Sequence, residues 1–241
     1  MTAYGPDLAH IHASGYTSLA KEAAPVVISL IGEPSGLVVD VGCGNGVTTR
    51  ALVEAGHDVL AVDASSAMLA MARRTAPGAR FQLASALDIE LPDCQAILAI
   101  GEVLNYTERS LDPFFKRARS AIQPGGLLVL DLAGPGRVPG RKPVRHWNAG
   151  EDWAVLVETE EDPERRLLTR RMTTFRRRGV SWRRGEEVHR QRLHPPGDVA
   201  ARLRALGFRV RIRRGYGDER FAPGHFVVVA RVPNHRGRDR V

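Results

Sequence analysis

The sequence has little cysteine, and no apolar stretch in it approaches the ~20 residues of a membrane-spanning helix. Its two cysteines, Cys43 and Cys94, do not have the spacing of metal ligands, so we expect reduced thiols in a cytoplasmic protein. No cationic segment followed by an apolar core lies near residue 1, so no signal peptide is expected. These scarcities argue against a disulfide framework, a metal site and a membrane partner.

Lysine is also scarce, although the formal net charge is +8. The 35 basic residues include only Lys21, Lys116 and Lys142, which leaves 35 − 3 = 32 arginines. Such an excess of arginine, with many alanines, glycines and prolines, is typical of a GC-rich genome. The charge alone therefore does not predict a nucleic-acid partner. The length of 241 residues and the 43% hydrophobic content suit one α/β domain with one insertion.

A glycine loop at residues 42–46 is the most informative segment. It follows an apolar run at residues 37–41, which is typical of a buried parallel strand. A helix is predicted after it, at residues 47–55. Glycine lets the backbone approach a ligand closely and adopt positive φ. In open α/β sheets, a loop in this position binds nucleotide-like ligands. The three glycines alternate with other residues: Gly42, Gly44 and Gly46.

The glycine spacing and an acid before the loop indicate which ligand is bound. A dinucleotide site has the pattern G-x-G-x-x-G, whereas this loop has G-x-G-x-G after Asp40. A carboxylate here suits an ammonium group better than a pyrophosphate. The run Asp-Val-Gly-Cys-Gly resembles the first motif of the class I S-adenosylmethionine-dependent methyltransferases. That resemblance implies that Asp40 favours the ammonium of S-adenosyl-L-methionine, while its methionine part lies over Gly42, Cys43 and Gly44.

The second strand, predicted at residues 58–63, ends in another acid, Asp63. An acid at this place accepts hydrogen bonds from ribose hydroxyls, both in methyltransferases and in NAD enzymes. The run Asp-Ala-Ser-Ser-Ala-Met-Leu that begins at Asp63 resembles the D-x-S-x-x-M-L segment of small-molecule methyltransferases. The resemblance implies that Met68 lies near the adenine and that Ala64 also contacts the cofactor.

The adenine and sulfonium contacts are expected after the third and fourth strands, predicted at residues 80–83 and 96–100. Methyltransferases of this type often hold the adenine amino group with an acid where this sequence has Ser85. The resemblance therefore implies that Ser85 and the backbone of its neighbours Ala86 and Leu87 bound the adenine. At the end of the fourth strand, the residues expected beside the sulfonium are Ile100 and Gly101.

Three side chains are candidates for a general base or an orienting group: Glu102, Tyr106 and His12, in that order. The first two follow the fourth strand, whose carboxyl end should face the sulfonium methyl. His12 and Tyr4 lie in a helical segment that related methyltransferases use to cover the cofactor. Displacement at a sulfonium methyl needs mainly alignment and exclusion of water. A base helps when the nucleophile carries a proton near neutral pH.

The predicted fold is α/β: a Rossmann-like, doubly wound seven-stranded sheet with a C-terminal antiparallel hairpin and an inserted antiparallel β-sheet lid. Alternating side chains indicate the strands of the insertion. Five of its residues are candidates to face inward and set specificity: Arg145, His146, Trp147, Trp153 and Arg171. For the many arginines of the insertion, a solvated face is the favoured alternative. The expected parts are a helical cover at 1–35, a core at 36–133 and 196–232, the lid at 134–195 and a tail at 233–241.

The resemblance implies an S-adenosylmethionine-dependent methyltransferase that transfers a methyl group to nitrogen or oxygen of a small molecule. Two alternatives stay open. An RNA methyltransferase would need a contiguous basic face leading to the site, and a binding protein would hold S-adenosylmethionine without consuming it. The glycine spacing and Asp40 disfavour a nicotinamide oxidoreductase. The sequence does not indicate the oligomeric state.

Overall fold

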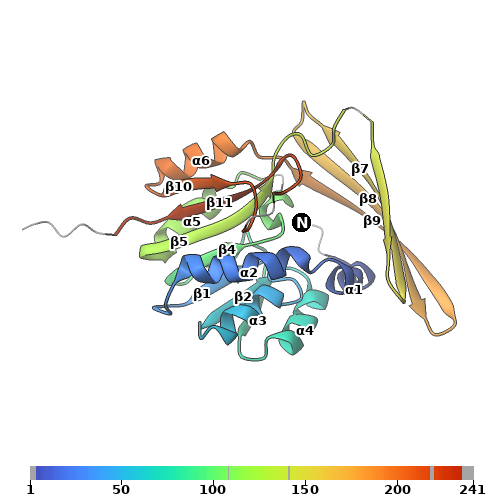
Figure 1. Cartoon of the computed structure of the whole chain (residues 1–241), viewed down its shortest axis with the longest axis horizontal. Coiled ribbons are helices and arrows are strands. Elements are labelled where there is room, and N and C mark those ends of the chain that lie inside the picture. The colour runs from blue at the N-terminus through green and yellow to red at the C-terminus, as the bar shows by residue number, and fades with distance from the viewer. Residues whose placement is uncertain (1–3, 108, 141, 218–219, 235–241) are drawn as a thin grey trace, which may run out of the picture.

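The computed structural model describes residues 4–107, 109–140, 142–217 and 220–234, and it contains two β-sheets (Figure 1). The larger sheet has seven strands in the order β10-β11-β5-β4-β1-β2-β3. Strands β1 to β5 are parallel, and β10 and β11 form an antiparallel hairpin at one edge. The strands are β1 (Val38–Val41), β2 (Val59–Asp63), β3 (Arg80–Leu83), β4 (Cys94–Ala99), β5 (Ile122–Ala133), β10 (Arg209–Arg213) and β11 (His225–Arg231).

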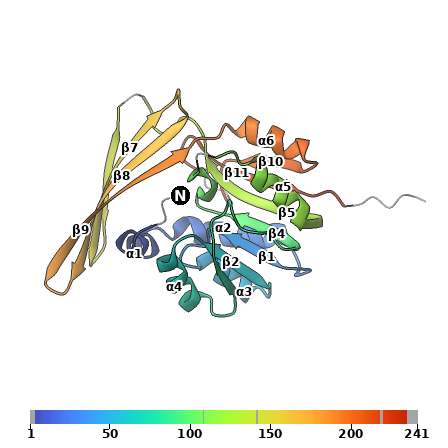
Figure 2. The ribbon, with the colours of Figure 1, turned by 180° about the vertical axis from the view of Figure 1, so that it is seen from behind.

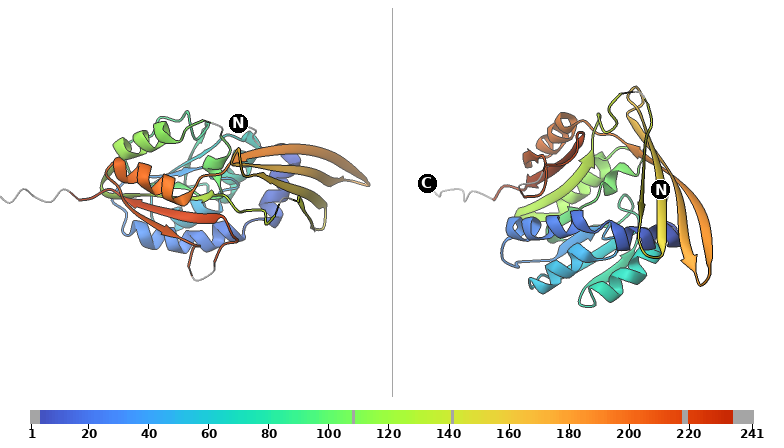
Figure 3. Two further views of the ribbon diagram at one scale, coloured as in Figure 1. Left: turned by 90° about the horizontal axis from the view of Figure 1, so that it is seen from above. Right: turned by 45° about the vertical axis from the view of Figure 1, so that its right-hand side comes forward.

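Helices cover both faces of this sheet, because its central strands are apolar on both sides. One face carries α2, α3 and α4, and the other carries α5 and α6. Figure 3 shows these two helical layers with the sheet between them. The helices are α1 (Pro6–Gly15), α2 (Ser18–Ile31), α3 (Val47–Glu54), α4 (Ser66–Thr75), α5 (Asp112–Ala121) and α6 (Pro196–Ala205), with a 3₁₀ turn η1 (Val103–Asn105). None of the helices in the described part of the chain is long and apolar enough to cross a membrane.

The strand order confirms the predicted Rossmann-like core. The order reverses between β1 and β4, which creates a crevice at their carboxyl ends where open α/β sheets bind ligands. A Pro-Gly-Gly segment at residues 124–126 interrupts the regular pairing of β5. The strand begins at Ile122, and its register against β4 shifts between the pairs Cys94↔Ile122 and Ala96↔Leu127. The glycines are accommodated as an irregularity within the strand.

The predicted inserted sheet is confirmed as four antiparallel strands: β6 (Val144–Ala149), β7 (Trp153–Asp162), β8 (Leu167–Arg178) and β9 (Ser181–Arg192). It extends from the carboxyl end of the core, and α1 lies against it (Figures 1 and 2). Ile11 of α1 packs with Trp153, Val155 and Val157 on the inner face of β7. The inserted sheet, α1 and the core therefore surround one region of space. The boundary proposed at residues 134 and 195 stays a prediction.

Three of the five residues expected to face inward lie on the outer face. Trp147 is 74% exposed, whereas Trp153 is 5% exposed and packs against α1. Arg145 and Arg171 are exposed and pair with glutamates of the neighbouring strand β7. Arg145 and Trp147 lie on β6, a strand that the alternation pattern did not reveal. Arg171 lies on β8 and faces outward because its neighbours Arg170 and Met172 face the cavity. Of the predicted tail, residues 235–241 lie outside the described residues.

Candidate functional site

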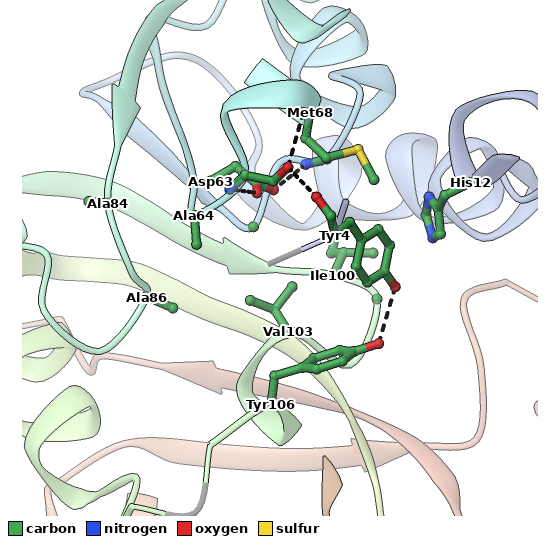
Figure 4. A pocket seen from close by; sticks show the side chains of 14 residues that line it. Tyr4, His12, Asp63, Ala64, Met68, Ala84, Ala86, Ile100, Val103 and Tyr106 are labelled. Carbon is green, nitrogen blue, oxygen red and sulfur yellow. Dashed lines mark hydrogen bonds between the residues drawn. The ribbon is translucent and has the colours of Figure 1, made fainter. Parts of the chain in front are cut away.

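A cavity lies at the carboxyl ends of the parallel strands (Figure 4). It is bordered by the loops that follow β1, β2, β3 and β4 and by the N-terminal segment. Nine of the thirteen residues predicted to contact the cofactor line it: Tyr4, Gly42, Gly44, Asp63, Ala64, Met68, Ala86, Ile100 and Gly101. Two of the three candidate catalytic residues, His12 and Tyr106, line it as well. The contacts of these residues with a cofactor stay a prediction.

The glycine loop adopts a conformation that other residues would resist. Gly42 and Gly44 have φ of +72° and +56°, in the left-handed region. A Cβ on Gly42 would lie 2.4 Å from Cγ2 of Val103. A Cβ on Gly44 would meet no atom within 4 Å, since this residue borders the open cavity. The loop is thus packed tightly on one side and leaves space for a ligand on the other.

Asp63 holds the glycine loop and the start of α4 together. Its Oδ2 accepts a hydrogen bond from the backbone N–H of Gly44 at 2.9 Å, and its Oδ1 accepts one from the N–H of Ser65 at 2.8 Å. Burial raises the pKa of Asp63, and hydrogen bonds from backbone N–H groups oppose that rise. The carboxylate lines the cavity with further lone pairs, so it can accept hydrogen bonds from vicinal hydroxyls.

The other four predicted cofactor residues do not line the cavity: Asp40, Cys43, Ser85 and Leu87. Asp40 is buried and accepts a 2.6 Å hydrogen bond from Oγ1 of Thr49. Burial raises the pKa of Asp40 to about 6, although the Thr49 hydrogen bond lowers it. This geometry does not support direct contact between Asp40 and a cofactor ammonium. The Cys43 side chain packs beneath the loop against Leu69.

Ser85 and Leu87 form a local turn that presents their neighbour to the cavity. Oγ of Ser85 accepts a hydrogen bond from the N–H of Leu87 at 3.2 Å. The carbonyl of Leu87 accepts a hydrogen bond from Arg117. Ala86, between them, is buried and lines the cavity. A serine at this position therefore shapes the turn, and its side chain does not line the cavity.

A second cavity adjoins the first. Both are lined by Tyr4, His12, Gly101 and Tyr106. The second cavity is also bordered by α2, by the linker after β5, and by the inner face of β7 and β8. Its polar lining consists mainly of charged or titratable side chains: Glu102, Arg137, His146, Arg170 and His225, besides His12.

Glu102 borders this second cavity as part of a buried ion cluster. Its Oε1 lies 2.8 Å from Nη2 of Arg137, and its Oε2 lies 3.2 Å from Nη1 of Arg170. Nε2 of Gln191 also donates to Oε2 at 3.0 Å. Burial raises the pKa of Glu102, but the two guanidinium groups outweigh it, so the pKa stays below its usual value. A carboxylate held in this way is a weak proton acceptor and a strong hydrogen-bond acceptor.

Asp131 at the end of β5 fixes the backbone that carries Glu102. Its side chain is fully buried and accepts from the N–H groups of Gly101 at 2.9 Å and Glu102 at 2.7 Å. The hydroxyl of Tyr216 donates to it at 3.0 Å, and Nε2 of His225 lies 3.0 Å away. Glu102 adopts φ of +58°, which is uncommon for a residue other than glycine. The four contacts of Asp131 stabilise that conformation.

The N-terminal segment crosses both cavities and is attached on each side. Oγ of Ser65, in the core, donates to the carbonyl of Tyr4 at 3.0 Å. The hydroxyl of Tyr4 lies 3.1 Å from that of Tyr106 (Figure 4). Asp7 forms ion pairs with two arginines of the inserted sheet, Arg178 and Arg183. Residues 4–7 thus connect the core to the inserted sheet above the site.

His12 lines both cavities. Burial lowers its pKa to about 4, so the imidazole is neutral at physiological pH. Among the described residues, its buried Nδ1 has no hydrogen-bond partner. A neutral imidazole has one acceptor nitrogen, so His12 can accept a hydrogen bond from a bound molecule.

The shifted pKa of His12 predicts a loss of stability in acid. The folded pKa of about 4 lies below the ordinary 6.5, so folding favours the neutral ring. The folding stability that depends on a neutral His12 ring is fully present above pH 6.5 and is lost as the pH falls toward 4. At 1.36 kcal/mol per pKa unit, that loss is at most about 3 kcal/mol. Urea denaturation between pH 7 and 4 should show a shallower decline for His12→Gln than for the wild type. A residual slope should remain from His194, whose pKa is also lowered to about 4, but an unchanged slope would contradict the assignment.

Several residues of the site were not predicted from the sequence. Ser65, Ala84 and Val103 line the first cavity, and each lies next to a predicted element or residue. Asp131 had a visible signal, because it is a third acid at the end of an apolar strand, like Asp40 and Asp63. Arg137 and Arg170 had no such signal in the sequence, since nothing distinguishes them from the other arginines of the insertion.

Comparisons with known proteins agree with this geometry. Residues 38–126 match the family model described as a methyltransferase domain. The chain is 29% identical to carboxy-S-adenosyl-L-methionine synthase of Aeromonas salmonicida over 136 residues. The matched segment makes up 52% of this chain and 54% of that protein. The chain therefore spans about half the length of this curated relative.

Solved structures of similar fold cover nearly the whole chain. An S-adenosylmethionine-dependent methyltransferase from Clostridium acetobutylicum has a TM-score of 0.80 at 17% identity, over 94% of this chain and 98% of that chain. A sugar N-methyltransferase from Streptoalloteichus has a TM-score of 0.74 at 21% identity, over 97% of this chain and 94% of that chain. The matched model identifies residues 38–126 as a methyltransferase domain, and the strand order of the larger sheet agrees with the fold of these solved methyltransferases.

Proposed function

We propose that the protein transfers the methyl group of S-adenosylmethionine to nitrogen or oxygen of a small molecule. The observation that carries this proposal is the junction of the two cavities at Tyr4, His12, Gly101 and Tyr106. The first cavity has the glycine loop and the acid Asp63 that suit the nucleoside. The second cavity is closed on one side by the inserted sheet and suits a compact acceptor.

The residues of the first cavity would orient the cofactor. Asp63 would accept hydrogen bonds from the ribose hydroxyls, and the turn around Ala86 would border the adenine. The methionine part would lie over Gly42 and Gly44, which directs the sulfonium toward Gly101. Bound cofactor supplies an activated methyl group, so the protein mainly aligns the acceptor and excludes water.

The second cavity would supply the groups that meet the acceptor. His12 is neutral and lines both cavities, so it would accept a hydrogen bond from a hydroxyl or an amine, while its pKa of about 4 makes it a weak proton acceptor. Glu102 is ion-paired, so we assign it an orienting role and not that of a base. Tyr106 hydrogen-bonds Tyr4 and positions the cover. This order differs from the one that the sequence favoured, because the partners of Glu102 come from distant parts of the chain.

A small acceptor is supported over RNA by the state of the exposed arginines. Arg145 and Arg171 on the outer face pair with glutamates at 2.6 and 3.2 Å. The N-terminal segment also lies across the site. The likeness to a sugar N-methyltransferase supports a small polar acceptor as well.

Calorimetric titration with S-adenosylmethionine, S-adenosylhomocysteine and NAD tests the proposal. The two sulfur nucleosides should bind at one site per chain, and NAD should not. Formation of S-adenosylhomocysteine is then followed with a panel of small amines and alcohols. Binding of NAD alone would overturn the cofactor assignment. Binding of the nucleosides without turnover on any acceptor would favour the non-catalytic alternative.

A pair of glycine variants tests where the cofactor lies. Gly44 and Gly32 both have positive φ, +56° and +77°, and a Cβ on either would meet no atom within 4 Å. Alanine at Gly44 should cost about 1–2 kcal/mol of folding stability, and alanine at Gly32, whose ψ is −152°, about 1–3 kcal/mol. Only Gly44 lines the first cavity, so Gly44→Ala should also weaken S-adenosylhomocysteine binding by about tenfold or more. Equal affinities of Gly44→Ala and Gly32→Ala would place the cofactor elsewhere.

A further inference from the structure

The second cavity has an imbalance of fixed charge. One carboxylate, Glu102, faces two guanidinium groups, Arg137 and Arg170, and these are the only acidic and arginine side chains among its described lining residues. The histidine His12 is neutral near pH 7, because burial lowers its pKa to about 4. The carboxylate thus compensates one guanidinium and leaves the other without a lining carboxylate. The Arg137 side chain is only 16% exposed, and partial burial strengthens the attraction of such a charge for anions.

The two arginines differ in how fully their donors are used. Arg170 contacts Glu102, Gln191 and Tyr106, so it is part of the wall. Among the described residues, Arg137 has one partner, Glu102, at 2.8 Å. A guanidinium has five N–H donors arranged as a planar fork. Arg137 borders the cavity, so most of its donors are available to a bound molecule.

The backbone on both sides of Arg137 is held in place. The N–H of Gly136 donates to Oε1 of Glu161 at 2.8 Å, and the N–H of Val138 donates to Oε2 of the same residue at 2.9 Å. Val138 is buried against Leu168 and Leu193. The linker is therefore fixed to the inserted sheet around Arg137. A guanidinium presented from fixed backbone loses less entropy on binding than one on a free loop.

We propose that Arg137 binds an anionic group of the acceptor, a carboxylate or a phosphate, in the second cavity. This inference rests on the proposed function, because it assigns the second cavity to the acceptor. A planar guanidinium binds either anion through two parallel N–H···O hydrogen bonds. The anion would neutralise the excess charge and leave the other end of the acceptor free to reach Gly101. The acceptors that fit are small molecules with a nucleophilic nitrogen or oxygen at one end and an acidic group at the other.

Binding of simple anions tests the assignment without knowledge of the acceptor. The probes are pyrophosphate for a phosphate group, malonate for a carboxylate, and malonamide as the uncharged analogue of malonate. Each is titrated by calorimetry into the protein with and without saturating S-adenosylhomocysteine. The variants are Arg137→Gln, Arg137→Lys and the control Arg145→Gln. Arg145 also pairs with a single glutamate, but its side chain is 80% exposed on the outer face.

At least one anion should bind the wild type more tightly than malonamide does. Arg137→Gln should weaken that binding about tenfold or more, Arg137→Lys should restore part of it, and Arg145→Gln should match the wild type. The anion that binds more tightly identifies the phosphate or the carboxylate class. The inference is overturned if neither anion exceeds malonamide, or if both glutamine variants lose affinity equally. Because the anion titrations also run without S-adenosylhomocysteine, failure of nucleoside binding contradicts the cofactor proposal separately.

Discussion

Replacing Asp63 with alanine should weaken S-adenosylmethionine binding by two orders of magnitude or more. The carboxylate lies in the first cavity at the end of β2, where it would accept hydrogen bonds from two ribose hydroxyls. Hydrogen bonds to a charged acceptor contribute about 1.5–3 kcal/mol each, and every 1.4 kcal/mol is about tenfold in affinity. The variant also loses the contacts that hold the N–H groups of Gly44 and Ser65. Calorimetry with S-adenosylmethionine gives the affinity directly.

The matched control is Asp58→Ala, at the other end of the same strand. Asp58 is 64% exposed and pairs with Arg80 at the surface. Exposed pairs of this kind contribute about 0–1 kcal/mol, so the variant should bind the cofactor like the wild type. If Asp63→Ala kept wild-type affinity, the ribose would not lie against this strand end.

Replacing Asp131 with alanine should give the largest loss of stability among single changes at the site. The side chain is fully buried and has four partners: the N–H groups of Gly101 and Glu102, the Tyr216 hydroxyl and His225. Removal leaves these groups buried without an acceptor, and breaking such a buried cluster costs about 3–5 kcal/mol. Urea denaturation should report this loss as a lower midpoint. Methyl transfer should also fall, because Glu102 is no longer fixed beside the sulfonium position.

Asp112→Ala provides the comparison for that loss. Asp112 is 50% exposed and lies 3.5 Å from Arg202. Its removal should change the free energy of unfolding by less than about 1 kcal/mol. Similar losses for both variants would show that the contacts around Asp131 contribute little, and that another feature holds Glu102 in its left-handed conformation.

The core was predictable because its signals are local in the sequence. All parallel strands except β3 contain an apolar run, and Asp40 and Asp63 mark the ends of the first two. The positive φ of Gly42 and Gly44 has a local cause as well, since only glycine adopts this conformation without strain. The order of these strands in the sheet creates a crevice at their carboxyl ends, and the first cavity lies in that crevice.

The acceptor side was less predictable because its contacts join distant segments. Glu102 looked like a base from its place after β4, but Arg137 and Arg170 reach it from the linker and from β8. Neither the pairing nor its effect on the pKa of Glu102 can be deduced from spacing. The facing of Trp147 depended on the register of β6 against β7, and a shift of one residue reverses the face of every side chain.

The most direct test of the account is a crystal structure of the complex with S-adenosylhomocysteine. The central claim is that one nucleoside spans the first cavity and presents its sulfur to the second. The ribose hydroxyls should lie within hydrogen-bond distance of Asp63, and the sulfur should lie beside Gly101, facing the cavity that Glu102 and Arg137 border. A nucleoside bound outside this groove, or one whose sulfur faces away from the second cavity, would contradict the claim.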